Sequence, residues 1–483
     1  MVKRYRMYID GQWVDGETGE TFQSFNPATG QTIAELPRGT RNDAARAIAA
    51  ARKGSRIISR MSVWDRSRLC LKIADVMEKR ADELARTLAE EQGKPYHTEA
   101  KAEVQTAIAG FREAAELVKW LETSFIPVED PNKRVFTIRQ PRGVYAVVTP
   151  WNFPINIPVE YLAPGIASGN AIVWVPAPTT SVCAVKLMEC LEEAGVPAGV
   201  VNLVTGEGPV VGDEIVSNPG TDAVGFTGSS ATGRRIAERA AGKPLLLELG
   251  GNGPTIIFED ADLEAAAEAV AVGCFFNAGQ TCSATEKILV HESVADAVAE
   301  LLAAKAKQIK VGDPFDPQVT MGPLNNEPTA AKMDRHVQDA IDRGAKLLAG
   351  GSRLAELGSP LFYAPTVMAG VPSDSAFSME ESFGPVAPLI SFRTEEEALQ
   401  LADQGDLGLV SSVWTKQMGR AFRCAEAIKT GIVNINEAST YWELHIPFGG
   451  ASGKRSGIGR LGGKYTLMEM TDLKTISFDI SRA

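Results

Sequence analysis

Short apolar runs that alternate with helical patterns constrain the fold of this chain most. The runs cover residues 143–148, 171–175, 200–204, 222–226 and 244–248, and helix-like segments such as 180–194 and 230–241 separate most of them. Buried strands that alternate with helices form a parallel sheet with helices on both faces. The sequence therefore predicts an α/β fold in which ligands bind beyond the carboxyl ends of the strands.

A second α/β series follows residue 282. Its strand-like runs are 287–291, 410–414 and 431–435, and its helical patterns lie near 293–308, 326–343, 395–404 and 417–428. A chain of 483 residues is also too long for a single hydrophobic core. We therefore expect two or three packed domains.

Three further stretches are predicted to be extended. Residues 7–14 predict a small hairpin about Asp10-Gly11, and residues 124–140 predict a hairpin that projects from the body. Residues 472–480 alternate like a half-exposed strand, and a terminal strand has an unpaired edge that needs a partner. The 124–140 hairpin is the candidate partner, in this chain or on another subunit.

Charge and composition exclude several classes of partner. The net charge is −11 and the Lys and Arg residues are dispersed, which argues against nucleic acid. No stretch has the apolar length of a membrane span, and the basic N-terminus lacks the apolar run of a secretory signal. The six cysteines form no C-x-x-C pair and the four histidines show no metal-ligand spacing. We expect a cytoplasmic protein without a bound metal.

A single cysteine ends the stretch that runs from Phe275 to Cys282. This stretch leaves an alanine-rich helical pattern and continues through small and polar residues. A thiol beside a turn can stay accessible and act as a nucleophile. The alternative is a small buried hydrophobe, which is what most free cysteines are.

Two other polar residues are candidates for a catalytic role. Glu248 ends an apolar run before Gly250 and Gly251, and a partly buried carboxyl there can act as a general base. Asn152 lies between prolines and aromatic residues, and a rigid amide N–H can stabilise an oxyanion. The alternatives are a surface glutamate and an ordinary turn asparagine.

Two loops suit a dinucleotide. Residues 226–233 place a glycine turn between a strand and a helix, where free backbone N–H groups can bind a pyrophosphate, although the G-x-G-x-x-G fingerprint is absent. In the 380–386 loop, Glu381 can accept from ribose hydroxyls and Phe383 can pack on a flat ring. Either loop alone is more simply explained as an ordinary α/β connection.

Six motifs in this order resemble the aldehyde dehydrogenase superfamily, from about residue 7 to residue 480. They are Pro150-Trp151-Asn152-Phe153-Pro154, Phe226-Thr227-Gly228-Ser229, Glu248-Leu249-Gly250-Gly251, Gly279-Gln280-Thr281-Cys282, Glu381-Ser382-Phe383-Gly384-Pro385 and Pro447-Phe448-Gly449-Gly450. The resemblance implies two Rossmann-like parallel-sheet α/β domains and a small β oligomerisation element. The implied ranges are 1–123 and 141–249 for the coenzyme domain, 250–466 for the catalytic domain, and 124–140 with 467–483 for oligomerisation into a homodimer or homotetramer.

The resemblance also implies a mechanism with NAD or NADP as hydride acceptor. Cys282 would attack an aldehyde, Asn152 and the Cys282 backbone N–H would hold the oxyanion, and Glu248 would activate water to hydrolyse the thioester. The implied coenzyme-binding residues are Thr149, Pro150, Trp151, Val175, Pro178, Gly208, Phe226, Thr227, Gly228, Ser229, Leu249, Gly250, Glu381 and Phe383. The candidate substrate wall is Phe153, Ile157, Phe276, Thr281, Ser283, Tyr441, Trp442 and Phe448, whose aromatic members suggest an apolar tunnel.

The chain departs from the family pattern at two places. Val175 and Pro178 replace the usual lysine and glutamate that bind the adenosine ribose, so the sequence leaves the choice between NAD and NADP open. Thr179, Thr180 or Trp174 could substitute for the lost contacts. The 449–460 loop is longer than usual and is similar to that of members acting on aromatic aldehydes.

Three alternatives to a hydrolytic dehydrogenase of an aromatic or other apolar aldehyde stay open. A semialdehyde dehydrogenase is one of them. A CoA-acylating enzyme is another, although that branch typically lacks the glutamate that matches Glu248. The third is a catalytically retired member with a structural or binding role, which only the changes at Val175 and Pro178 support.

Overall fold

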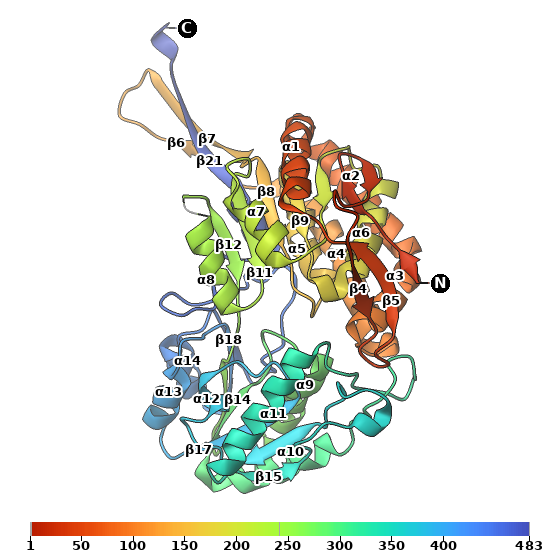
Figure 1. Cartoon of the computed structure of the whole chain (residues 1–483). Coiled ribbons are helices and arrows are strands. Elements are labelled where there is room, and N and C mark those ends of the chain that lie inside the picture. The colour runs from red at the N-terminus through yellow and green to blue at the C-terminus, as the bar shows by residue number, and fades with distance from the viewer. Residues whose placement is uncertain (1, 241, 483) are drawn as a thin grey trace.

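The computed structural model describes residues 2–240 and 242–482 and shows two α/β bodies with a β arm (Figure 1). Residues 1, 241 and 483, which fall at the ends of predicted ranges or helices, lie outside the described residues. Within those residues, no helix has both the length and the apolar character needed to cross a membrane.

The larger sheet has the strand order β20-β12-β11-β8-β9-β10-β2-β3. All five apolar runs predicted between residues 143 and 248 form its parallel strands, which are β8 (Val144–Val148), β9 (Ala171–Val175), β10 (Val201–Leu203), β11 (Ala223–Thr227) and β12 (Leu245–Glu248). The predicted N-terminal hairpin, β2 (Met7–Ile9) and β3 (Gln12–Val14), extends one edge antiparallel to β10. Its turn places Asp10 and Gly11 at φ 52° and 79°, as a two-residue hairpin turn requires.

Helices cover both faces of this sheet, as the strand pattern predicted. Tyr145 and Val147 point into one core, and Val144 and Ala146 point into the core on the opposite face. The first core packs against α2 (Val63–Lys79), α3 (Ala81–Gln92), α4 (Lys101–Leu117), α5 (Asn156–Ser168) and α6 (Ser181–Glu193). The second packs against α1 (Arg41–Ile58), α7 (Asp213–Ser217) and α8 (Ser230–Arg239).

Short elements complete this body. A small sheet of order β1-β5-β4 comprises β1 (Lys3–Arg4), β4 (Thr21–Phe25) and β5 (Thr32–Pro37). Single turns are η1 (Tyr96–Ala100), η2 (Val118–Trp120), η3 (Pro178–Thr180) and η4 (Gly208–Gly212).

The second sheet has the order β15-β16-β17-β14-β13-β18-β19 and is parallel except for its edge strand β15. Three of its strands match predicted runs, namely β14 (Lys287–His291), β18 (Val410–Trp414) and β19 (Ile432–Ile435). The sequence analysis missed β13 (Pro254–Ile257), β15 (Lys346–Ala349), β16 (Thr366–Ala369) and β17 (Val386–Phe392). These strands are short or contain proline, as β17 does at Pro388, and proline weakens a strand signal.

Most helices of the second body lie close to the predicted patterns, and the short helix at residues 376–379 was not predicted. The helices are α9 (Leu263–Phe275), α10 (Ala295–Ala306), α11 (Glu327–Asp342), α12 (Ala376–Met379), α13 (Glu395–Asp403) and α14 (Met418–Ala427), with the turns η5 (Phe276–Gly279), η6 (Glu292–Val294) and η7 (Ala355–Leu357). The chain then returns to the first sheet, where β20 (Gly457–Ile458) pairs with β12.

The β arm projects from the first body and carries the C-terminal strand (Figure 1). It consists of β6 (Phe125–Ile126), β7 (Lys133–Pro141) and β21 (Thr471–Asp479), which follows α15 (Gly463–Glu469) and precedes η8 (Ile480–Arg482). β21 pairs with β7 along its whole length, from Thr471 opposite Pro141 to Asp479 opposite Lys133. The predicted partner of the terminal strand is therefore confirmed, and it lies in the same chain.

Candidate active site

Cys282 follows a tight turn at the end of α9. Asn277, Ala278 and Gly279 have φ angles of 51°, 54° and 72°, so the chain leaves the helix in left-handed conformations. A Cβ atom on Gly279 would lie 2.1 Å from the Gly384 carbonyl oxygen. The turn therefore packs directly on the loop that carries Glu381 and Phe383.

The Cys282 thiol differs from the other thiols in its exposure. Of the six cysteines, all within the described part of the chain, five are buried and Cys282 is partly exposed. A Cβ atom on Gly251 would lie 2.1 Å from the Cys282 carbonyl oxygen. The loop that follows Glu248 therefore packs against the Cys282 backbone, which brings the predicted nucleophile and base to one place.

Glu248 ends β12 with its side chain buried. Among the described residues, neither of its carboxyl oxygens has a hydrogen-bond partner. Burial raises the pKa of Glu248 well above its ordinary value, the Glu160 carboxyl adds to the rise, and Arg460 opposes it. A buried carboxylate that accepts no hydrogen bond has a high affinity for a proton. A general base that acts on water or on a thiol needs this property.

The surrounding acids also hold the thiol of Cys282 in its neutral form. Burial raises the pKa of Cys282 well above the usual range, and the nearby carboxyls of Glu248 and Glu381 add to the rise. A hydrogen bond from the Cys282 backbone N–H lowers it. Because the thiolate is the nucleophile, a proton must leave Sγ before attack.

Asn152 is held by a network of buried hydrogen bonds. The side-chain Nδ2 of Asn152 donates to the Gln280 backbone carbonyl at 3.1 Å. The backbone carbonyl of Asn152 accepts from Asn277 Nδ2 and from Lys94 Nζ, at 3.0 Å each. An amide nitrogen carries two N–H groups, so a second one is left to stabilise an oxyanion. The network fixes Asn152 next to the turn that precedes Cys282.

The two loops predicted to bind a dinucleotide, 226–233 and 380–386, both lie next to the loop that follows Glu248. Glu381 Oε1 accepts from the Gly251 N–H at 3.0 Å, and a Cβ atom on Gly250 would lie 2.8 Å from Glu381 Oε2. Ser229 caps α8, and the buried hydroxyl of Ser230 has no partner among the described residues. Unpaired donors at a helix N-terminus and a carboxylate across a glycine loop fit a dinucleotide.

The predicted ring-contacting residues also lie together. Phe383 has a φ of 58° and packs edge-to-face on Trp151, with ring centroids 5.5 Å apart. The Glu286 carboxylate accepts from the backbone N–H groups of Ser382 and Phe383 at 2.6 Å each. These bonds stabilise the strained loop that presents Phe383.

The other predicted coenzyme residues differ in exposure. Thr149, Phe226, Thr227, Leu249 and Gly250 are buried, Pro150, Trp151, Pro178 and Gly228 are half-buried, and Gly208 and Ser229 are exposed. Val175 is only 1% exposed and packs in the sheet core. Of its suggested substitutes, Trp174 is fully buried and donates to Thr149 Oγ1 at 2.8 Å, Thr180 is buried, and Thr179 is exposed. The suggestion that Trp174 packs on the coenzyme is therefore wrong.

A cavity of about 240 Å³ opens beside Cys282 and Glu248. It is lined by seven of the eight predicted wall residues, namely Phe153, Ile157, Phe276, Thr281, Ser283, Trp442 and Phe448. Tyr441 is not among the lining residues, because its side chain is exposed and its hydroxyl donates to Glu443 Oε1 at 3.0 Å. Thr440 lines the cavity instead.

The sequence analysis missed the buried charges around this cavity. Lys94 Nζ donates to Glu103 Oε2 at 2.6 Å and lies 3.7 Å from the centre of the Phe153 ring. Lys94 lies behind the wall, and the missed charged side chains that line the cavity itself are Glu99, Glu103 and Glu160. A signal existed for two of the missed charges, since Lys94 interrupts the helical pattern between Gly93 and Pro95, and Glu160 is a lone charge in the apolar sequence of α5.

A partly exposed cysteine beside a buried carboxyl, between two parallel α/β sheets and next to dinucleotide-type loops, fits an oxidoreductase that binds a dinucleotide. Comparison with known proteins gives the family. The sequence profile described as "Aldehyde dehydrogenase family" matches residues 13–476. The chain belongs to the aldehyde dehydrogenase family, as its motifs indicated, and is an NAD(P)-dependent aldehyde dehydrogenase.

Individual relatives cover nearly the whole chain. A glutarate-semialdehyde dehydrogenase of Pseudomonas putida is 38% identical over 99% of this chain and 98% of its own. The crystal structure of a succinate-semialdehyde dehydrogenase from Burkholderia pseudomallei is 38% identical, with a TM-score of 0.96 over 99% of this chain and 98% of its own. The structure of a betaine aldehyde dehydrogenase from Staphylococcus aureus in complex with NAD+ is 35% identical, with a TM-score of 0.95 over 99% and 95%.

Proposed function

We propose that this protein oxidises an aldehyde to the carboxylic acid through a thioester on Cys282. The overall reaction converts an aldehyde, water and oxidised nicotinamide coenzyme into a carboxylate, reduced coenzyme and two protons. The observation that carries the proposal is the meeting of a partly exposed Cys282 with a buried, unpartnered Glu248 at the end of one cavity.

The first step is attack of Cys282 Sγ on the aldehyde carbon. The thiol loses its proton to solvent, a C–S bond forms as the carbonyl π bond breaks, and the carbonyl oxygen takes the negative charge. The free N–H of Asn152 Nδ2 and the Cys282 backbone N–H stabilise that oxygen. Because both donors are held in place before the substrate arrives, they cost little reorganisation during the reaction.

Bound NAD(P)+ supplies the acceptor for the hydride that leaves the thiohemiacetal carbon. The chain contributes orientation, since Glu381 would hold the nicotinamide ribose and Phe383 would bound the ring. Gly228 and Ser229 would face the pyrophosphate. Loss of the hydride converts the thiohemiacetal into a thioester on Cys282.

Hydrolysis then needs a base, and Glu248 is the residue proposed for it. Its ionised carboxylate takes a proton from water as the water oxygen bonds to the thioester carbon. The C–S bond breaks, Glu248 passes the proton taken from water to the departing Sγ, and the released acid loses its own proton to solvent. A buried base beside Cys282 supports water as the acyl acceptor over a thiol such as CoA, and an intact pair of Cys282 and Glu248 argues against a retired site.

The class of substrate, the domain ranges and the mode of assembly are also proposals. Aromatic side chains in the cavity wall favour an apolar or aromatic aldehyde body, whereas relatives named semialdehyde dehydrogenases favour a semialdehyde. We also propose the domain ranges given above, with coenzyme held by residues 1–123 and 141–249, catalysis by 250–466, and assembly of dimers or tetramers through 124–140 and 467–483.

The test is reduction of NAD+ and NADP+, measured in parallel with aliphatic, aromatic and semialdehyde substrates. Wild-type protein should reduce at least one coenzyme. The ratio of the two activities gives the preference between NAD+ and NADP+ of a chain that has Val175 and Pro178 at these positions. Cys282→Ala should abolish the activity without loss of fold, whereas Cys190→Ala, which changes a fully buried thiol, should keep it. Near wild-type turnover by Cys282→Ala would refute the proposed nucleophile.

A further inference from the structure

The substrate cavity is lined by several acidic side chains. Glu99, Glu103, Glu160 and Glu248 line it, and no Lys, Arg or His is among the described residues that do. Aldehydes with a distal carboxylate, such as glutarate or succinate semialdehyde, would bring a negative charge into this space. An anion could bind only while the wall carboxyls stay protonated, whereas a cation can pair with one that ionises, so the wall suits a cation better.

Three of the four carboxyls already have a role in the fold or in the chemistry. Glu103 accepts from Lys94 Nζ at 2.6 Å and from the backbone N–H groups of Ile155 and Asn156. Glu99 Oε1 accepts from the Asn277 N–H at 3.1 Å, which supports the turn before Cys282. Glu248 is the proposed base. Glu160 is therefore the carboxyl left to interact with a substrate.

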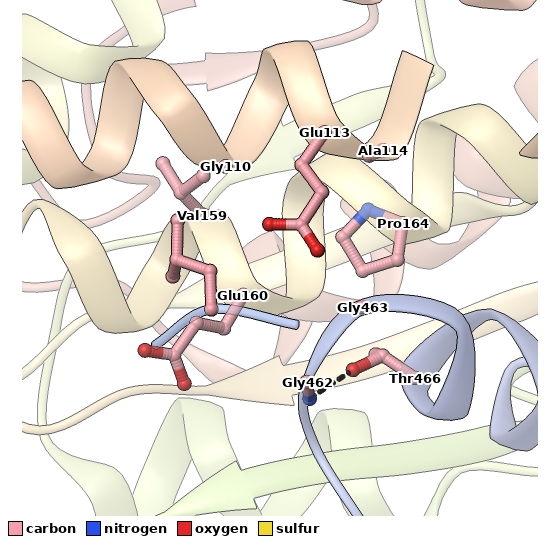
Figure 2. Close-up of a pocket in the computed structure, with 10 residues that line it drawn as sticks. Gly110, Glu113, Ala114, Val159, Glu160, Pro164, Gly462, Gly463 and Thr466 are labelled. Carbon is pink, nitrogen blue, oxygen red and sulfur yellow. Dashed lines mark hydrogen bonds between the residues drawn. The ribbon is translucent and has the colours of Figure 1, made fainter. Parts of the chain in front are cut away.

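Glu160 is held in the wall by its own helix. Its Oε1 accepts from Asn156 Nδ2 at 2.7 Å, one turn earlier in α5. Glu160 lines both the substrate cavity and a smaller cavity of about 40 Å³. Figure 2 shows it in the smaller cavity, which Glu113 of α4 also lines. A lone carboxyl inside an apolar helix is costly to bury, so a partner of opposite charge would stabilise it.

The aromatic side chains of the same cavity favour the same kind of partner. The ring centroids of Phe153 and Phe276 lie 6.0 Å apart, and those of Trp442 and Phe448 lie 5.3 Å apart. The faces of aromatic rings attract cations, and quaternary ammonium groups are commonly bound among such rings. Lys94 does not fill this role for the cavity, because it is fully buried beneath Phe153 and paired with Glu103.

We propose that the substrate is an aldehyde with a positively charged distal group, an ammonium or quaternary ammonium, which the carboxylate of Glu160 and the neighbouring aromatic rings bind. This inference rests on the proposed function and names the substrate class of the same site. Glu160 is a specificity-determining residue in this account, because it contacts the far end of the substrate while Cys282 acts on the aldehyde carbon.

The protonation of Glu160 gives a readout that does not need turnover. Burial raises the pKa of Glu160 to about 8, with a further rise from Glu103 and an opposing hydrogen bond from Asn156. The other ionisable groups that line the two cavities beside it are Glu99, Glu103, Glu113, Glu248 and Cys282. Below this pKa the carboxyl is mostly protonated, so a bound cation should displace a proton at pH 7.

The test compares three aldehydes of matched length and different charge. They are 4-trimethylammoniobutanal, its neutral carbon isostere 5,5-dimethylhexanal, and glutarate semialdehyde. Wild-type kcat/KM should be greatest for the cation, by roughly tenfold or more over the neutral isostere, as expected for a hydrogen bond or contact with a charged group. The anion should be the poorest substrate of the three.

Glu160→Gln should remove the preference for the cation and leave kcat/KM for the neutral isostere within about threefold of wild type, since only a charged interaction is lost. Glu113→Gln is the matched control, because Glu113 lines only the smaller cavity and should leave all three ratios unchanged. A wild-type preference for glutarate semialdehyde, or an unchanged cation preference in Glu160→Gln, would overturn the inference.

Calorimetry with the Cys282→Ala variant separates this inference from the proposed reaction. 4-Trimethylammoniobutanal should bind more tightly than 5,5-dimethylhexanal and should release a proton at pH 7, measured in buffers of different ionisation enthalpy. The proton release should vanish when Glu160→Gln is added. Selective binding without turnover by the wild type would refute the proposed reaction alone, and equal binding of both compounds would refute the role of Glu160.

Discussion

At the scale of single residues, the site is defined by two acids that are both held in their protonated forms. Burial raises the pKa of the Glu248 carboxyl and of the Cys282 thiol, and the Glu248 carboxyl adds to the rise at Cys282. Ionisation of the thiol is therefore coupled to the charge of Glu248. In the proposed mechanism, the order of proton movement lets Cys282 act first as nucleophile and Glu248 act later as base.

Glu248→Gln should separate the two half-reactions. The glutamine is close in size but cannot take a proton from water, so thioester hydrolysis should slow by a factor of about 100 or more, the usual contribution of a general base. Hydride transfer comes earlier and needs no activated water, so a burst of reduced coenzyme should persist in stopped-flow absorbance. Glu238→Gln, an exposed control on α8, should behave as wild type. Wild-type steady-state turnover in Glu248→Gln would remove this residue from the mechanism.

The raised pKa of Glu248 also sets the sign of a pH effect. The carboxylate is the active base, and it forms only as the pH rises through the elevated pKa, so the hydrolysis rate should increase toward alkaline pH. In Glu248→Gln that dependence of the hydrolysis rate should be absent. A hydrolysis rate that falls as the pH rises would contradict the assignment.

The predictability of single residues followed their place in local motifs. Cys282, Glu248 and Asn152 stand in short patterns that can be recognised in the sequence, and the structure brings them to one site. Lys94 and Glu103 could not be assigned in that way. Their ion pair bears on the site only because Lys94 Nζ also donates to the Asn152 backbone carbonyl, and Asn152 is far from both of them in the sequence. The lone charge of Glu160 in α5 was visible, but the cavity it faces was not.

At the scale of elements, the turn between α9 and Cys282 is the most demanding local structure. Three successive residues have positive φ, and the turn is closed by bonds from Gln92 to Asn277 and from Asn277 to Gln280. Such a conformation persists only when its surroundings hold it. The turn therefore couples the packing of α3 to the position of the Cys282 thiol.

Gly279→Ala should disrupt this element. The new Cβ would lie 2.1 Å from the Gly384 carbonyl oxygen at a φ of 72°, so the turn must move and both kcat and the melting temperature should fall. Gly344→Ala is the matched control, since Gly344 has a φ of 94° with open space around it. It should cost only the backbone strain, about 1–2 kcal/mol of unfolding free energy. Equal losses of kcat in the two variants would show that the contact with Gly384 does not position the site.

The elements themselves were predictable where their periodicity was strong. The parallel strands of the first sheet are apolar throughout and lie between clear turns, so their runs stood out. In the second sheet, β16 and β17 lie next to Gly-Pro and proline-containing segments, which weaken the strand pattern. The pairing of β17 with β14 stabilises β17 as a strand, and this tertiary contact is not visible in the local sequence.

At the scale of the whole molecule, the β arm is the part proposed to contact another subunit. It exposes large apolar side chains away from the two α/β bodies, including Phe125 at 68%, Leu473 at 56% and Phe478 at 48%. Clustered exposed apolar residues on a projecting sheet favour contact with another subunit. The sequence predicted both the pairing of β21 with β7 and a 124–140 hairpin that projects, and the structure shows the paired strands projecting from the body (Figure 1).

The combined variant Phe125→Asp, Leu473→Asp should therefore reduce the sedimentation coefficient to that of a monomer, because charges would replace the proposed contact surface. Phe422→Asp, at an equally exposed position on α14, should not change the assembly. An unchanged oligomer in the combined variant, or a monomeric wild type, would contradict the role proposed for the arm.

The central claim is that oxidation proceeds through an acyl group bound to Cys282, and trapping that group is its most direct test. Glu248→Gln is mixed with NAD+ or NADP+ and an aldehyde that the wild type oxidises, quenched in acid within the burst, and examined by peptide mass spectrometry. The account predicts a mass increase equal to the acyl group on the peptide that contains Cys282, in proportion to the reduced coenzyme formed. Reduced coenzyme without an acyl group on Cys282 would contradict it.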